Sequence, residues 1–108
     1  MASQERIKAL KDFLVKDPDD IFSRYALALE YKSFGEMDNA ILELVELLRR
    51  DPKYIAGFQQ LGQIYHALNK TREAKRYLRK GIEVAAAAND IHAKQEMEEE
   101  LEEIEDEW

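Results

Sequence analysis

The apolar positions of this chain follow helical spacing in successive segments, separated by short polar stretches that carry proline, glycine or asparagine. In the first segment the apolar residues lie three or four apart, which predicts an amphipathic helix with Ser3 as its N-cap. Pro18 ends this helix, because the residue before a proline is pushed out of the helical region. The second segment starts near Ile21 and is too densely apolar for one stripe, so we expect a helix covered on two or more sides.

The whole pattern returns after thirty-four residues. Asp17-Pro18 recurs as Asp51-Pro52. Gly35 ends the second helix, and Asn69 occupies the equivalent position thirty-four residues later. Glycine and asparagine are the residues that best tolerate the left-handed conformation of a helix stop. The other pairs at this offset are Ile21 and Ile55, Leu27 and Leu61, Tyr31 and Tyr65, and Ala40 and Ala74. A fixed period of this size indicates one helical hairpin that was copied and stacked.

Both ends of the chain fit the same register. The apolar residues of the first helix align, at offset thirty-four, with those before Pro52, so this helix is the second half of a unit whose first helix is missing. The last segment has a narrow apolar stripe among acids, as expected of a helix that caps a stack. We therefore predict one domain over residues 1–108, with a half-repeat helix at 1–17, repeat 1 at 18–51, repeat 2 at 52–88 and an acidic capping helix at 89–108.

The repeat residues resemble those of the tetratricopeptide repeat (TPR) family of small bacterial proteins. The residues that carry the resemblance are Leu27-Ala28, Tyr31, Ala40, Leu44 and Pro52 in the first unit, and Phe58, Leu61-Gly62, Tyr65, Ala74, Leu78 and Gly81 in the second. Arg24 and Leu47 depart from the family pattern, which concerns local packing. The resemblance implies an all-α fold, a right-handed α-solenoid of antiparallel helix pairs with about six helices.

The resemblance also implies a function, because TPR arrays bind peptides or helices on the concave surface lined by the first helix of each unit. By this reasoning the chain is a protein-interaction module or scaffold for a partner of unknown identity. The groove-facing candidates are Phe22, Tyr25, Leu29 and Lys32 in repeat 1, with Ala26 beside them, and Gln59, Gln60, Gln63 and His66 in repeat 2. Aromatic residues could anchor a partner and glutamine amides could bond its backbone. The asparagine slots of the chaperone-binding TPR clamp hold Ala26 and Gln60 here, which argues against that partner.

Two other interpretations of the apolar stripes stay open. The groove residues could instead pack against neighbouring helices, and the terminal helices could either cap the monomer or meet a second copy in a homodimer. The candidates for self-association are Ile7, Leu10 and Leu14 in the first helix, and Met97, Leu101, Ile104 and Trp108 in the last. The last four recur at spacings of four, three and four, like a short heptad seam.

The charge is concentrated at the C-terminal end. Residues 90–108 hold ten acidic residues and one basic residue, whereas the rest of the chain is nearly balanced. This end disfavours nucleic acid and anionic membranes as partners. A basic run, Lys70, Arg72, Lys75, Arg76, Arg79 and Lys80, precedes it. It fits a solvated outer face, a patch for an acidic partner, or a contact with the acidic helix of this or a neighbouring molecule.

Residue types suited to catalysis are sparse. The chain has no cysteine, which excludes disulfides and thiol chemistry. His92 and Glu96 lie four apart, but two ligands do not make a metal site. We recognise no phosphate loop or nucleophile motif, so we expect no enzyme activity and no cofactor. The first ten residues resemble no signal peptide and no apolar run is long enough to span a bilayer, so we expect a cytoplasmic protein.

Overall fold

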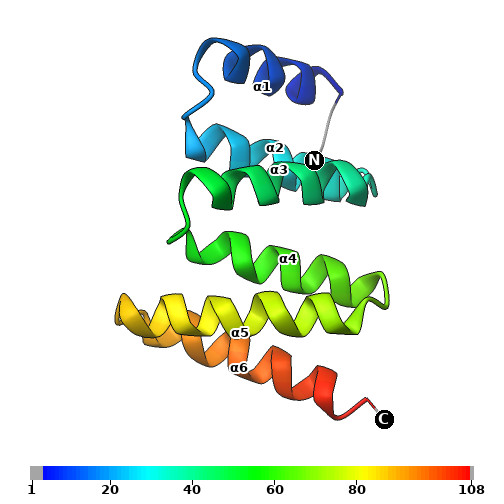
Figure 1. The fold of residues 1–108 in the computed structure, drawn as a ribbon. Helices are drawn as coiled ribbons and strands as arrows, with labels where there is room; N and C mark the ends of the chain where they lie inside the picture. The colour runs from blue at the N-terminus through cyan, green and yellow to red at the C-terminus, as the bar shows by residue number, and fades with distance from the viewer. Residues whose placement is uncertain (1–3, 108) are drawn as a thin grey trace. The chain divides into compact units, whose positions relative to one another are not determined.

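A computed structural model describes residues 4–107 of the chain, and this part consists of helices joined by short loops (Figure 1). The six helices are α1 (Gln4–Lys16), α2 (Ile21–Ser33), α3 (Met37–Arg50), α4 (Ile55–Ala67), α5 (Thr71–Ala87) and α6 (Ile91–Glu105). The predicted all-α fold with about six helices is therefore confirmed for the described residues. Ser3, the expected cap of α1, lies outside them.

The chain divides into two compact units, Met1–Pro52 (unit 1) and Lys53–Trp108 (unit 2). In unit 1, α2 packs against both α1 and α3. In unit 2, α5 packs against both α4 and α6, and α4 also touches α6. The predicted repeat boundaries at 17/18, 51/52 and 88/89 all fall in loops between helices. That the chain forms a single domain stays a prediction.

The helix stops use the residues that the repeat indicated. Gly35 has φ 77° and Asn69 has φ 61°, so both occupy the left-handed region. Asn89, which the repeat register did not identify, repeats the device with φ 58° after α5. In each case the next amide donates to a carbonyl five residues back; the donor of Lys70 reaches the carbonyl of Tyr65 at 2.8 Å. These bonds satisfy carbonyls that the helix end would leave unpaired.

Aspartates begin two of the helices. The carboxylate of Asp20 accepts a bond from the Ser23 amide at 3.2 Å at the start of α2. Asp90 does the same for the Ala93 amide at 3.1 Å at the start of α6. Such caps supply an acceptor to N–H groups without a partner in the first turn. Asp90 is thus the N-cap of the acidic helix, one residue before Ile91, close to the expected start.

Glycines allow the helices of unit 2 to approach closely. A Cβ at Gly62 of α4 would lie 2.6 Å from Cγ of Leu78 in α5. A Cβ at Gly81 of α5 would lie 2.5 Å from Sδ of Met97 in α6 and 2.8 Å from Cβ of Phe58 in α4. Glycine is therefore required at these two positions by the close packing of the helices and not by the conformation of a turn. The core that they enclose contains Ala74, Leu78, Ala85, Met97 and Ile104.

Unit 1 accommodates the residue that departs from the repeat pattern. Arg24 of α2 is buried, and its guanidinium donates to Glu43 of α3 at 2.8 Å and to the carbonyl of Pro18 at 2.9 Å. A buried charge is tolerated when it is paired and hydrogen-bonded. Leu47, the other departure, is completely buried. Neither substitution disturbs the helices in which it lies.

Candidate functional site

An apolar hollow lies on α2 in unit 1, at the position where the sequence predicted the first half of a binding groove. Its volume is about 280 Å³. Three of the predicted residues, Phe22, Tyr25 and Leu29, line it together, and Phe22 is 77 % exposed. The complete lining is Arg6, Phe22, Tyr25, Ala26, Leu29 and Glu30. Because these side chains converge on one space, the hollow can receive a single apolar side chain of a partner.

One edge of this hollow is an ion pair between α1 and α2 that the repeat pattern does not indicate. Nε of Arg6 in α1 lies 2.9 Å from Oε1 of Glu30 in α2, and the Glu30 side chain is only 12 % exposed. The pair joins the half-repeat helix to the first complete repeat. The opposite charges were visible in the sequence, but their meeting depends on the register between α1 and α2. Lys32, the remaining groove candidate of repeat 1, is half-buried and does not line the hollow.

The predicted amide row on α4 is engaged within unit 2. The side-chain amides of Gln59 and Gln63 both donate to the carboxylate of Glu100 in α6, the second at 2.9 Å. His66 contacts Glu107 in the same way, through Nε2 and Oε1. Gln60 is half-buried. The structure therefore brings two of the four repeat-2 candidates to α6 and a third, His66, to the segment that follows it.

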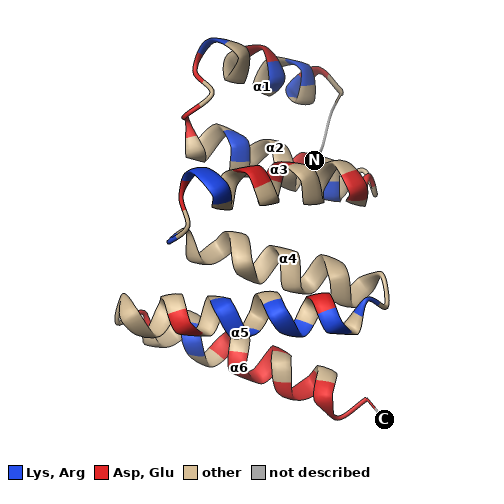
Figure 2. Cartoon of the chain, viewed as in Figure 1, with Lys and Arg blue, Asp and Glu red and all other residues tan. Residues whose placement is uncertain are grey.

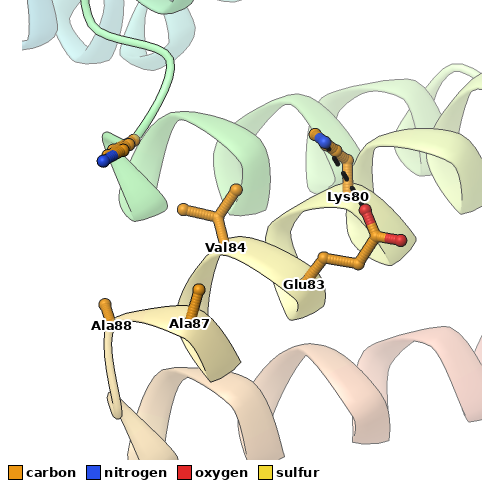
Figure 3. Close-up of a pocket in the computed structure, with 6 residues that line it drawn as sticks. Lys80, Glu83, Val84, Ala87 and Ala88 are labelled. Atoms are coloured by element: carbon orange, nitrogen blue, oxygen red, sulfur yellow. Dashed lines mark ion pairs between the residues drawn. The ribbon is translucent and has the colours of Figure 1, made fainter.

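A second hollow, of about 380 Å³, lies where the end of α5 meets the start of unit 2 (Figure 3). Its apolar part is formed by Val84, Ala87 and Ala88. Figure 3 shows Lys80 and Glu83 beside one another, joined by an ion pair of 3.5 Å. Lys53 completes the lining. The hollow thus combines an apolar wall with two lysines and one carboxylate.

The residues predicted for self-association are mostly used inside the units. Ile7 and Leu14 in α1 are buried, as are Met97 and Ile104 in α6. Leu10 and Leu101 are half-buried, and Trp108 lies outside the described residues. The four buried side chains cannot contact another chain without unpacking their own helices. The heptad-like stripe of α6 thus faces the core of unit 2 rather than solvent.

The candidate metal ligands form an exposed pair. Nε2 of His92 lies 3.6 Å from Oε2 of Glu96, one turn apart on α6. Within residues 4–107, no group of three histidine, aspartate or glutamate side chains could hold a metal ion. In the same part of the chain, no helix is long and apolar enough to cross a membrane.

Comparison with known proteins yields a consistent result. The model of the family described as Tetratricopeptide repeat matches residues 1–83. The TPR repeat-containing protein PA0015 of Pseudomonas aeruginosa is 31 % identical over 91 residues, which cover 84 % of this chain and 87 % of that protein. A tetratricopeptide repeat domain protein from Salinibacter ruber, solved by NMR, has 31 % identity and a TM-score of 0.80, and the match covers 84 % of this chain and 92 % of that one.

A more distant structure has the same fold. The TPR2B domain of yeast Sti1, solved in a complex with pHsp70, has a TM-score of 0.86 at 15 % identity. The match covers 94 % of this chain and 82 % of that one. At this identity the likeness concerns the fold alone.

Proposed function

This chain belongs to the tetratricopeptide repeat family, and on that premise we propose that it binds a peptide or helical segment of a partner protein. The first contact is the hollow on α2, which takes an apolar side chain of the partner. Domains of this family generally mediate protein–protein interaction. The specific proposal is that Phe22, Tyr25 and Leu29 form the anchor site of this one.

The observation that carries the proposal is the convergence of these three side chains on one hollow. A volume of about 280 Å³ lies just below the range of about 300–1,000 Å³ typical of small-ligand pockets, which suits one large side chain. Binding energy at protein interfaces is usually concentrated in a few apolar or aromatic anchors that fill such pockets. The Arg6–Glu30 pair at the edge offers polar groups to the partner's backbone beside the anchor.

The row on α4 has a lesser part in the proposal. A partner that used Gln59 or Gln63 would first have to displace the carboxylate of Glu100, which already accepts from both amides. Exchanging one hydrogen bond for another yields little net free energy. The proposed binding surface also includes Gln60, His66 and Lys32, and no particular contact with the partner is assigned to these residues.

The likeness to the TPR2B domain of Sti1 supports a protein partner in general terms, since that domain was solved in a complex with pHsp70. We also propose that the chain acts without catalysis and without a cofactor, in the cytoplasm. A non-catalytic role agrees with the family, whose domains are typically interaction modules. Measurement of partner binding is therefore the direct test.

The test begins with an array of peptides that each carry one large apolar residue among polar ones, probed with the labelled protein. For the best peptide we expect Phe22→Ala to weaken binding about 30-fold, which corresponds to the roughly 2 kcal/mol of a typical anchor residue. Phe22 is mostly exposed, so its truncation leaves the fold intact. Fluorescence anisotropy gives the Kd of each variant.

Two control variants sharpen the result. Leu42→Ala removes an equally apolar side chain that is 67 % exposed on α3 and lines none of the hollows described above, so the Kd should not change. Gln63→Ala should also have a small effect, because its amide is engaged by Glu100. If Phe22→Ala binds as tightly as the wild type, the hollow on α2 is not the anchor site.

A further inference from the structure

Four basic side chains form a row along one face of α5. They lie at positions i, i+3, i+4 and i+7, the spacing that places residues on the same side of a helix. The members of this basic row are Arg72, Lys75, Arg76 and Arg79. At 1.5 Å per residue the row is about 10 Å long. A surface hollow of about 440 Å³ lies along it, lined by three of its arginines together with Lys80 and Glu83.

Most of the charge of the basic row is unused within the described part of the chain. Arg72 and Lys75 make no ion pair there, and Arg76 contacts only Tyr77, over whose ring its guanidinium lies at 5.0 Å. Arg79 alone reaches an acid, Glu105 of α6, at 3.6 Å. The row therefore presents positive charge to solvent along nearly its full length.

Helix α6 and its cap carry an acidic row with the same spacing. Its members are Glu99, Glu102, Glu103 and Asp106, again at i, i+3, i+4 and i+7. All four side chains are exposed, and within residues 4–107 none of them makes an ion pair or a side-chain hydrogen bond. The acidic row is as long as the basic row and has the opposite charge, residue for residue.

The two rows lie on neighbouring helices of the same unit. Helices α5 and α6 pack against each other, and the Arg79–Glu105 contact joins one end of the basic row to the acidic helix. Figure 2 shows the basic residues of α5 beside the acidic residues of α6 in unit 2. Unit 2 thus carries a basic band on α5 and an acidic band on α6.

We propose that these bands are an interface between two copies of this chain, in which the basic row of each copy faces the acidic row of the other. A two-fold axis across the helix pair makes the contact twice, since both rows belong to one unit. An unrelated acidic peptide could satisfy only the basic row and would leave the acidic row in solvent. A second copy of the chain pairs both rows, which favours it over an acidic peptide as the partner at this surface. The surface is separate from the hollow on α2, so the two proposals stand or fall independently.

Exposed ion pairs are individually weak and are screened by salt. We therefore expect a dimer that forms at about 10 mM salt, where the screening length is about 30 Å, and separates at about 500 mM. Sedimentation velocity over a range of protein concentrations measures both states. A wild-type chain that stays monomeric at low salt overturns the proposal, as does a dimer that persists unchanged at high salt.

A charge exchange tests the pairing directly. The quadruple variant R72E/K75E/R76E/R79E makes both bands acidic, and E99K/E102K/E103K/D106K makes both bands basic, so each alone should be monomeric. Mixed together they should form a heterodimer at low salt, because both contacts then join an acidic band of one chain to a basic band of the other. The control K11E/K16E reverses two exposed charges on α1 in the other unit and should still dimerise.

Circular dichroism confirms that each variant is folded, and the salt series of the wild type remains decisive if one is not. Failure of the mixture of folded variants to associate refutes the pairing of the two rows. A monomeric wild type that binds a poly-glutamate peptide instead would overturn the second copy as occupant and identify an acidic partner.

Discussion

Truncation of Met97 to alanine should strongly destabilise the chain, because this side chain fills the centre of unit 2. Met97 is completely buried, and its sulfur occupies the space above Gly81 of α5. Removing a buried methionine side chain costs about 2–5 kcal/mol, including the cavity that remains. For a chain of this size 1 kcal/mol corresponds to about 4 °C, so we expect the Tm to fall by about 8–20 °C.

The geometry also predicts a coupling between Met97 and Gly81. In Gly81→Ala the new methyl would lie 2.5 Å from Sδ of Met97 and 2.8 Å from Cβ of Phe58. Alanine gains about 1 kcal/mol of helix propensity over glycine, but overpacking costs about 1–3 kcal/mol, so the net loss is about 0–2 kcal/mol. With Met97→Ala the conflict with sulfur disappears and the methyl fills part of the cavity. The double variant should therefore lose about 0.5–3 kcal/mol less than the sum of the single variants.

Urea unfolding of the four proteins, followed by circular dichroism, measures this cycle. About 0.5 M salt in the buffer suppresses association through exposed charges. Gln95→Ala, an exposed position on the same helix, is the control and should change the free energy of unfolding by less than about 0.5 kcal/mol. Additive effects, or a loss below about 1 kcal/mol for Met97→Ala, would refute the packing argument. Unfolding midpoints that rise with protein concentration would instead indicate that the Met97 stripe contacts a second chain.

Two further predictions concern local conformation and pH. Gly35→Ala should destabilise the chain by about 1–2 kcal/mol in urea unfolding because its φ is 77°, and Gly35→Asn by less; equal losses would contradict a left-handed requirement. Hydrogen bonds from Arg49 and Arg50 lower the pKa of the Glu46 carboxyl from 4.5 to about 2. The stability contributed by these bonds is therefore present above pH 4.5 and is lost as the pH falls through about 2. A carboxyl titration by NMR should show this low pKa, and it should rise in Arg49→Ala; a pKa near 4.5 in the wild type would contradict the ion pairs.

The fold was predictable because its signals are local. The left-handed residues Gly35 and Asn69 and the prolines after α1 and α3 act within one turn of the chain, so they can be read without a structure. Asn89 ends α5 in the same left-handed conformation, but the repeat does not predict this helix stop. The reason is that α5 is 17 residues long and departs from the period of thirty-four. Arg24 was recognised as a departure from the pattern, whereas its bonds to Glu43 and Pro18 were not predictable.

The candidate site was predictable only in part. Phe22, Tyr25 and Leu29 line one hollow because helical periodicity decides which residues of α2 lie together, and their role in binding stays a prediction. The engagement of Gln63 by Glu100 was not foreseen, since these residues are 37 positions apart. Their meeting depends on the rotation and axial position of α6 against α4, which no repeat of residue types specifies.

By itself, the sequence determined the number of helices, their order and the residues that share a face of each helix, because these follow from short-range spacing and from the residues that end a helix. Tertiary structure alone decided which of the exposed-looking residues are still available. Met97 and Ile104 became core, and Gln59 and Gln63 became partners of Glu100, whereas the rows on α5 and α6 remained largely unpaired. The physical reason is that availability depends on distances between helices remote in sequence, and packing density rather than periodicity sets those distances.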